Sequence, residues 1–231
     1  LNAIVAEAFC EAADRLENAE DFDMAVHDLI KEYMTAHQRI IFNGDGYSDE
    51  WVKEAERRGL PNIRCMIDAA GTLTTDKSVR LFEKFGIFTK AELISREEII
   101  YETYAKTLNI EALTMINMAN KKIIPAVIRY SKSLADTVIA VKDAGADASV
   151  QRDILNTVSS KLITAKNALL RLEEATAQAG NIKSAKDKAF FYKDTVKVEM
   201  DALRKPVDEL ELIVDKSMWP MPTYGDLTFE V

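Results

Sequence analysis

Apolar residues recur at spacings of three and four along most of the chain, which is the pattern of amphipathic α-helices. The first such stripe spans Leu1 to Leu16, and a second begins near Asp21 and reaches about Ile41. Residues 2–43, 87–124 and 146–179 contain neither Gly nor Pro. Uninterrupted segments of this length, rich in Ala, Leu, Glu and Lys, favour helices. We therefore predict an all-α protein.

Glycine marks the interruptions in the first part of the chain. Asn43-Gly44-Asp45-Gly46 predicts a turn, because Asn, Asp and Gly tolerate a positive φ. Ser48 is suited to cap a short helix that Gly59 ends. Residues 60–88 are expected to be irregular, apart from one short helix at about 76–85 that stops at Gly86.

Longer helices follow. Thr89 is expected to open one that is apolar around most of its circumference, and the next runs from about Lys122 to Asp143, with Pro125 in its first turn. Two regular stripes complete the pattern, Ile154, Val158, Leu162, Ala165, Leu169 and Leu172, then Val196, Met200, Leu203, Val207, Leu210 and Val214. These heptad-like seams predict an antiparallel long-helix bundle over residues 89–216, with a kink at Pro206.

The last segment, residues 217–231, has a different composition. Pro220 and Pro222 exclude a helix through them, and the segment is expected to be an extended aromatic tail. Large apolar groups on a nonhelical terminus usually dock on another surface. We expect Trp219, Tyr224 and Phe229 to pack on helices or to contact a neighbouring subunit. The chain thus divides into residues 1–42, the turn-rich 43–88, the bundle 89–216 and the tail 217–231.

Charge and cysteine content narrow the classes of function. The formal net charge is -8, and such an acidic chain without a basic patch is not expected to bind nucleic acid. No apolar run is long enough to span a membrane. Cys10 and Cys65 are expected to be buried free thiols of a cytoplasmic protein. The chain starts at Leu1 without Met or a basic leader, which favours a segment cut from a longer polypeptide.

Motifs for metal or phosphate chemistry are missing from the sequence. Met24 and Met34 stand where a di-metal bundle would need Glu three residues before His27 and His37. Residues 43–54 have the spacing of a calcium loop, but Ser48 replaces its glycine and Tyr47 replaces a carboxylate. No Gly-rich phosphate loop occurs. No catalytic, cofactor-binding or metal-binding residue is therefore assigned.

Two polar features remain as candidates. Glu111 lies among apolar neighbours; it would have a raised pKa if buried alone, and a Lys or Arg partner on an adjacent helix is the expected alternative. Arg57 and Arg58 end the short helix, where cations complement the helix dipole. A structural role is favoured for this pair over an anion site.

Several stretches resemble the carboxy-terminal region of type III glutamine synthetases. The most specific is FNGDGYSDEWVKEAERRGL at residues 42–60. NIEALTM at residues 109–115, WPMPTYGDL at 219–227 and LNAIVAE at 1–7 match further family signatures in the same order. The resemblance covers essentially the whole chain, and residues 1–42 would close the catalytic-domain region.

This resemblance implies a parent enzyme that joins ammonia to glutamate with ATP and magnesium, and that forms hexameric rings paired into dodecamers. The family's catalytic residues lie upstream of this segment, so the chain alone is expected to be inactive. Its partners would be the upstream catalytic domain and neighbouring subunits. The alternative is a self-sufficient helical-bundle interaction module, whose seams would take a partner helix. A stand-alone metal enzyme is disfavoured by the scarcity of ligands.

Overall fold

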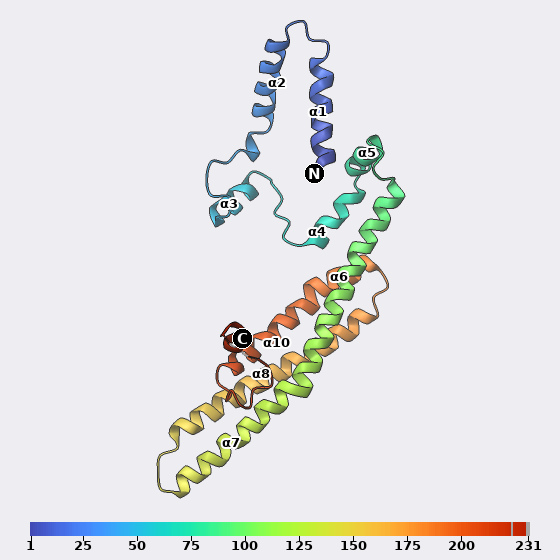
Figure 1. The fold of residues 1–231 in the computed structure, drawn as a ribbon. Coiled ribbons are helices and arrows are strands. Elements are labelled where there is room, and N and C mark those ends of the chain that lie inside the picture. The colour runs from blue at the N-terminus through green and yellow to red at the C-terminus, as the bar shows by residue number, and fades with distance from the viewer. Residues whose placement is uncertain (223, 230–231) are drawn as a thin grey trace. The chain divides into compact units, whose positions relative to one another are not determined.

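The computed structural model describes residues 1–222 and 224–229, with the side chains of Tyr224 and Phe229 left out. Within these residues all regular structure is helical, which confirms the all-α prediction. The chain divides into two compact units, Leu1–Ile100 and Tyr101–Val231 (Figure 1). No helix in the described ranges is long and apolar enough to cross a membrane.

The first unit consists of short helices and the beginning of a long one. Its elements are α1 (Asn2–Leu16), α2 (Phe22–Ala36), the 3-10 turn η1 (Gln38–Ile40), α3 (Asp49–Arg57), α4 (Met66–Ala70), the 3-10 turn η2 (Gly71–Thr74), α5 (Asp76–Lys84) and the first turns of α6 (Lys90–Met118). The α1–α2 hairpin is bridged by the ion pair of Arg15 with Glu32. Ile67 of α4 and Leu93 of α6 are completely buried.

Local sequence signals explain where these helices begin and end. Asp21, Ser48 and Thr75 each accept a hydrogen bond from a backbone N–H of the first turn that follows. Gly59 and Gly86 have φ of 70° and 62° after α3 and α5, a conformation that other residues rarely adopt. The predicted cap at Ser48 and both glycine stops are confirmed.

Residues 60–88 are more helical than expected, because α4 and η2 precede α5. Ile67 of α4 is completely buried. Tertiary burial can stabilise a helix too short to form alone. The segment just before α4 has no regular structure, as the helix-breaking Pro61 favours. Cys10 and Cys65 form no disulfide bond in the described part of the chain, and both are half-buried, whereas the sequence predicted them to be buried.

The long helix α6 continues through a π-helical turn, η3 (Ala119–Ile123), into α7 (Ile124–Asp143). The sequence predicted two separate helices with a break between them. Pro125 lies in the first turn of α7. Because the helical run is continuous here, Pro125 removes one backbone hydrogen bond, and the π turn just before it lets the run continue without ending the helix.

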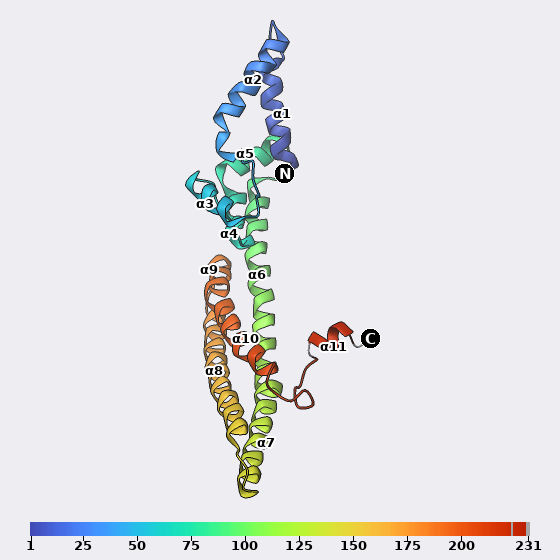
Figure 2. The same ribbon diagram turned by 90° about the vertical axis from the view of Figure 1, so that its left-hand side faces the viewer.

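The second unit is a bundle in which α8 (Ser149–Gly180) packs against both α7 and α10 (Lys197–Glu211). Gly145, with φ of 77°, turns the chain between α7 and α8. α9 (Ala185–Phe191) joins α10 through a second π turn, η4 (Tyr192–Val196). Figure 2 shows α8 and α10 side by side, as the two heptad-like stripes predict.

The buried stripes of α8 and α10 form the core of this unit. Leu169 and Leu172 of α8 and Leu210 of α10 are completely buried, and Leu203 of α10 nearly so. Lys161 and Arg171 of α8 form ion pairs with acidic side chains of α10 beside this seam. Pro206 lies inside α10 with its ring buried, and a kink at that point stays a prediction.

The C-terminal segment differs from the expected extended tail. Pro220 and Pro222 keep their surroundings irregular, but residues after them form a short helix, α11 (Tyr224–Phe229). No proline follows Pro222, so nothing blocks helical hydrogen bonds there. Asp226 in the first turn complements the positive end of the helix.

Candidate functional site

An apolar groove in the second unit lies between α6–η3 and α10, with the C-terminal segment on one side. Its volume is about 510 Å³, within the range of small-molecule pockets. Its apolar lining comprises Leu108, Met115, Met118, Ala119, Ile123, Met200, Leu203, Val207, Met221, Pro222 and Leu227. Four of these are methionines, whose flexible side chains adapt to irregular apolar surfaces.

The charged residues of the groove are mainly acidic. They are Glu111, Asp201, Asp208 and Glu211, against the basic Lys197 and Arg204. Arg204 donates from Nε to Oδ2 of Asp208 at 3.2 Å. The rim therefore carries two more acidic than basic residues.

Glu111, singled out from the sequence, is one of these groove residues. The structure places it at an exposed position of α6, so the buried carboxylate considered from the sequence is wrong. Helix periodicity explains this, because its apolar neighbours along the chain turn to other sides of α6. Within the described residues its carboxylate forms no ion pair, so the expected Lys or Arg partner is not found there.

The groove offers a mostly apolar surface with a charged rim. Its described lining includes neither His nor Cys, the commonest side chains for acid–base and nucleophilic steps. Nowhere in the described residues do three or more His, Cys, Asp or Glu side chains gather as a metal site would require. The arrangement can bind an apolar surface.

Arg57 and Arg58 form the second candidate, in the first unit. Arg57 donates to both carboxylate oxygens of Glu54, from Nε at 2.7 Å and from Nη2 at 2.6 Å. Arg58 donates to the same carboxylate from Nε at 2.5 Å, and from Nη1 to the backbone oxygen of Ile41 at 2.7 Å. Hydrogen bonds from Arg57 and then Arg58 lower the pKa of Glu54 to about 2.

Aromatic packing completes this motif. The Phe42 and Trp51 rings stack with centroids 4.3 Å apart, and the Arg58 guanidinium lies 5.6 Å from the Trp51 ring. The segment that gave the most specific family resemblance thus fastens α3 to the chain after α2. This geometry supports the structural role predicted for the arginine pair. An open pocket of about 550 Å³ beside it is lined partly by Arg39, Arg57 and Arg58.

The calcium-loop spacing at residues 43–54 has a different explanation. Glu54 would have to supply the bidentate ligand, but two guanidinium groups occupy its carboxylate. Asp45 accepts the backbone N–H of Tyr47 at 2.9 Å, as in an Asx turn. These side chains build a turn and a capped helix.

The structure describes the side chain of only one of the three aromatic residues predicted to anchor the C-terminal segment. Trp219 is only 7% exposed and belongs to the core cluster of the second unit. Its Nε1 has no hydrogen-bond partner in the described part of the chain. Tyr224 and Phe229 lie on α11, and their side chains fall outside the described residues.

The patterns in the sequence did not predict the groove. Met115 and Met118 are spaced three apart on α6 and therefore share a face, which is the one local signal of an adaptable apolar surface. The other side comes from Met200 and Val207, far along the chain. Only the packing of α6 near α10 brings the two sides together.

Comparison with known proteins identifies the family. The model of the glutamine synthetase C-terminal domain matches residues 25–142. A glutamine synthetase of Butyrivibrio fibrisolvens is 36% identical over 216 residues, which is 93% of this chain and 31% of that protein. A glutamine synthetase of Bacteroides fragilis is 30% identical over 99% of this chain and 33% of that protein.

A type-3 glutamine synthetase of Dictyostelium discoideum is 31% identical over 241 residues, covering 99% of this chain and 32% of that protein. The chain therefore spans about a third of the length of the curated relatives it matches. These matches confirm the resemblance to type III glutamine synthetases. Since the family model covers half of the sequence, the chain belongs to the glutamine synthetase C-terminal domain family.

Proposed function

We propose that this chain is the structural carboxy-terminal part of a glutamate–ammonia ligase. One observation carries the proposal: glutamine synthetases align along 93–99% of this chain, while the chain covers only 31–33% of their length. In the proposed parent enzyme, ammonia is joined to glutamate at the expense of ATP, with magnesium as the metal. A cytoplasmic location stays a prediction from the sequence.

The residues present do not suit ATP and magnesium chemistry. The described part of the chain contains no cluster of three or more potential metal-ligating side chains. The groove is mostly apolar and its rim is acidic, which disfavours a polyphosphate. We therefore propose that no residue of this chain takes part in the reaction. The remaining two-thirds of the proposed polypeptide would hold the nucleotide and the metal.

The proposed role of the bundle is to support the catalytic part and its assembly into hexameric rings and dodecamers. The buried seam between α8 and α10, with its flanking ion pairs, supports this proposal because it holds these two helices of the bundle together. We propose that Trp219, Tyr224 and Phe229 anchor the C-terminal segment, Trp219 within the bundle and the other two on the bundle or on a neighbouring subunit.

The alternative, a self-sufficient interaction module, has less support. It required the heptad-like seams to be available to a partner helix. Leu169 and Leu172 of α8 and Leu203 and Leu210 of α10 are instead buried within the chain's own bundle. The seams are therefore already occupied.

The test compares the isolated chain with the complete polypeptide that contains it. Glutamine formation is measured with glutamate, ammonia, ATP and magnesium for both proteins. We expect glutamine from the complete polypeptide and none from the isolated chain. Glutamine formed by the isolated chain, or an inactive complete polypeptide that is otherwise folded, would contradict the proposal.

A further inference from the structure

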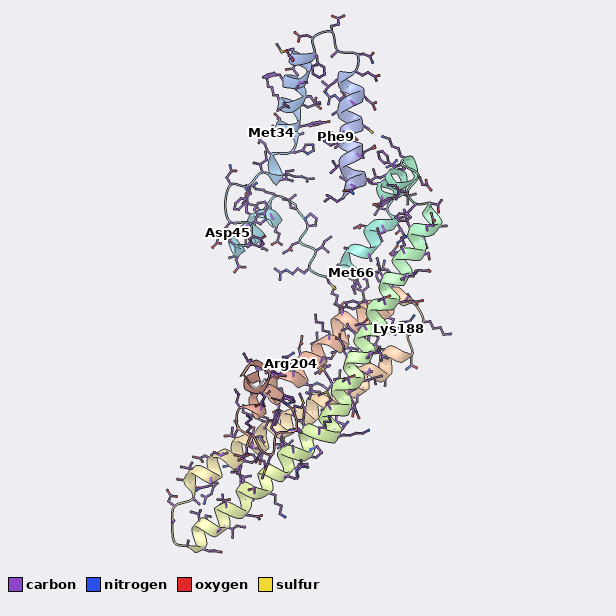
Figure 3. The ribbon with its side chains drawn as sticks, viewed as in Figure 1. Phe9, Met34, Asp45, Met66, Lys188 and Arg204 are labelled. Carbon is purple, nitrogen blue, oxygen red and sulfur yellow. The ribbon has the colours of Figure 1, made fainter. Side chains whose placement is uncertain are left out.

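A further pocket of the second unit lies between α6, the end of α8 and the start of the helical run from α9 into η4. Its volume is about 340 Å³, which is at the lower end of the range for small-molecule sites. Lys106, Lys183 and Lys188 line it (Figure 3 labels Lys188). We call it the lysine pocket. All of its lining residues belong to the unit Tyr101–Val231.

The lysine pocket has the opposite charge to the protein as a whole. The formal net charge of the chain is -8, yet the pocket lining carries three lysines against one carboxylate, that of Glu102. Lys106 donates from Nζ to Oε2 of Glu102 at 2.7 Å. Lys183 and Lys188 form no ion pair within the part of the chain that the structure describes. Their charges are therefore available to attract an anion.

The lysines on different elements act on the same space. The hydrogen bond from Lys106 lowers the pKa of Glu102 most, and the charge of Lys188 lowers it further. The ammonium group of Lys188 on α9 therefore lies close enough to α6 to affect a carboxylate there. Positive charges from two helices thus converge on one pocket.

A neutral hydrogen-bond donor lies beside these charges. The Tyr192 hydroxyl donates to Oδ1 of Asn109 at 2.8 Å, and both residues line the pocket. An amide whose oxygen accepts this bond keeps its NH₂ group for donation. Among the described residues the Asn109 NH₂ group has no protein acceptor. Ammonium groups have no acceptor atom, so the pocket offers mainly donors.

Small residues leave space between these polar groups. Ala105, Ala179, Gly180 and Ala185 line the pocket as well. A Cβ atom added at Gly180 would meet no heavy atom within 4 Å. Side chains this short cannot fill the hollow that the lysines surround.

We propose that the lysine pocket binds a small phosphate-bearing anion. Lysine ammonium groups bind phosphate as point charges. A phosphate monoester carries about two negative charges and three acceptor oxygens. These match the excess of two positive charges in the lining, three lysines less one carboxylate, and the several donors around the hollow. The site is separate from the proposed ligase reaction and does not depend on it.

NMR titration of the chain with inorganic phosphate and with pyrophosphate tests the site at a single group. The side-chain NH₂ signals of Asn109 should shift and reach saturation, and chloride at equal ionic strength should not shift them. Succinate should bind more weakly, because its two charges are held apart. Asn109 signals unmoved by phosphate or pyrophosphate up to about 10 mM, or succinate binding as tightly as either, would overturn the proposal.

Lysine substitutions identify the charges that bind. Lys183→Gln and Lys188→Gln should each weaken phosphate binding by roughly fivefold or more, because each removes a charge-assisted contact. Lys186→Gln removes the same charge from an exposed position of α9 outside the pocket lining, and it should change the affinity by less than about twofold. Equal losses for all three variants would show general attraction to a basic segment and would refute the pocket.

An amide substitution tests the neutral donor. Asn109→Asp keeps an oxygen that accepts from Tyr192 but replaces the NH₂ group with negative charge, and it should abolish phosphate binding. Asn156→Asp makes the same change in charge at an exposed position near the start of α8 and should retain binding. Circular dichroism verifies that both variants fold. Undiminished phosphate affinity in a folded Asn109→Asp variant would contradict the proposal.

Discussion

At the scale of single residues, Glu54 shows how one side chain organises a family motif. Its carboxylate accepts hydrogen bonds from Arg57 and Arg58, the two arginines at the end of α3. Arg58 in turn bonds the backbone oxygen of Ile41 and lies over the Trp51 ring. A residue that fits a calcium-loop position by spacing is thus the centre of an ion-pair network that closes a turn.

The low pKa of Glu54 predicts a pH-dependent contribution to stability. Because its folded pKa, about 2, lies below the ordinary value of 4.5, the contribution is present above pH 4.5 and is lost as the pH falls toward 2. Glu54→Gln should destabilise the first unit at neutral pH and abolish this dependence. Carboxyl NMR titration measures the midpoint, and urea unfolding at several pH values measures the stability.

The matched control is Glu50→Gln, an exposed carboxylate on the same helix. It should leave the low-pH behaviour unchanged. A Glu54 midpoint near 4.5 in the folded protein would contradict the guanidinium network.

At the scale of elements, the bundle depends on the seam between α8 and α10 and on local caps. The buried residues of α8 lie three and four positions apart along the helix. Most residues between them face solvent. Leu172 is completely buried whereas Leu170, two residues away, is 50% exposed. The same residue type in one helix therefore allows a direct comparison.

We expect Leu172→Ala to lower the free energy of unfolding by about 2–5 kcal/mol, because it leaves a cavity in the seam. Leu170→Ala should change it by no more than about 0.5 kcal/mol, as is usual at the surface. Denaturant unfolding followed by circular dichroism measures both. Equal losses for the two variants would mean that the seam is not packed as described.

The N-terminus of α6 is fixed by a capping box. The Thr89 N–H donates to Glu92 Oε2 at 2.8 Å, and the Glu92 N–H donates to Thr89 Oγ1 at 3.4 Å. Thr89→Ala should cost about 0.5–2 kcal/mol of stability. Thr107→Ala, at an exposed position inside α6, should cost less. Thermal unfolding compares the two, and equal effects would show that the cap contributes nothing.

At the scale of the whole molecule, the two compact units have unequal cores. The unit Leu1–Ile100 buries few side chains, such as Leu29, Ile67 and Leu93. The unit Tyr101–Val231 contains one continuous cluster contributed by α6, α7, α8 and α10. Buried apolar area is the main favourable term in folding, so the first unit should be the less stable of the two.

We therefore expect urea unfolding of the isolated chain to show two transitions, with the first unit unfolding at the lower urea concentration. Ile67→Ala should shift only the earlier transition, and Leu172→Ala only the later one, because each residue is completely buried in its own unit. Exchange measured at single amides assigns the transitions. A single transition shifted by both variants would contradict independent cores.

Local patterns in the sequence predicted the elements whose causes are local. The cap at Ser48 and the stops at Gly59 and Gly86 were each predicted from a few neighbouring residues. The period of three and four predicted the buried seam of α8 with α10. Errors arose where distant packing decides the structure, as in α4 and in the continuous run from α6 through η3 to α7.

The sequence by itself determined the helical class, the family and the residues that make the seam, because helix periodicity, caps and motif order are encoded within short stretches of chain. Only the tertiary structure decided that Glu111 is exposed on the rim of an apolar groove, that Glu54 binds two arginines, and that Phe9 is left uncovered. The exposure of a side chain and its ion-pair partner depend on which segments pack together in space. Short stretches of sequence do not determine that packing.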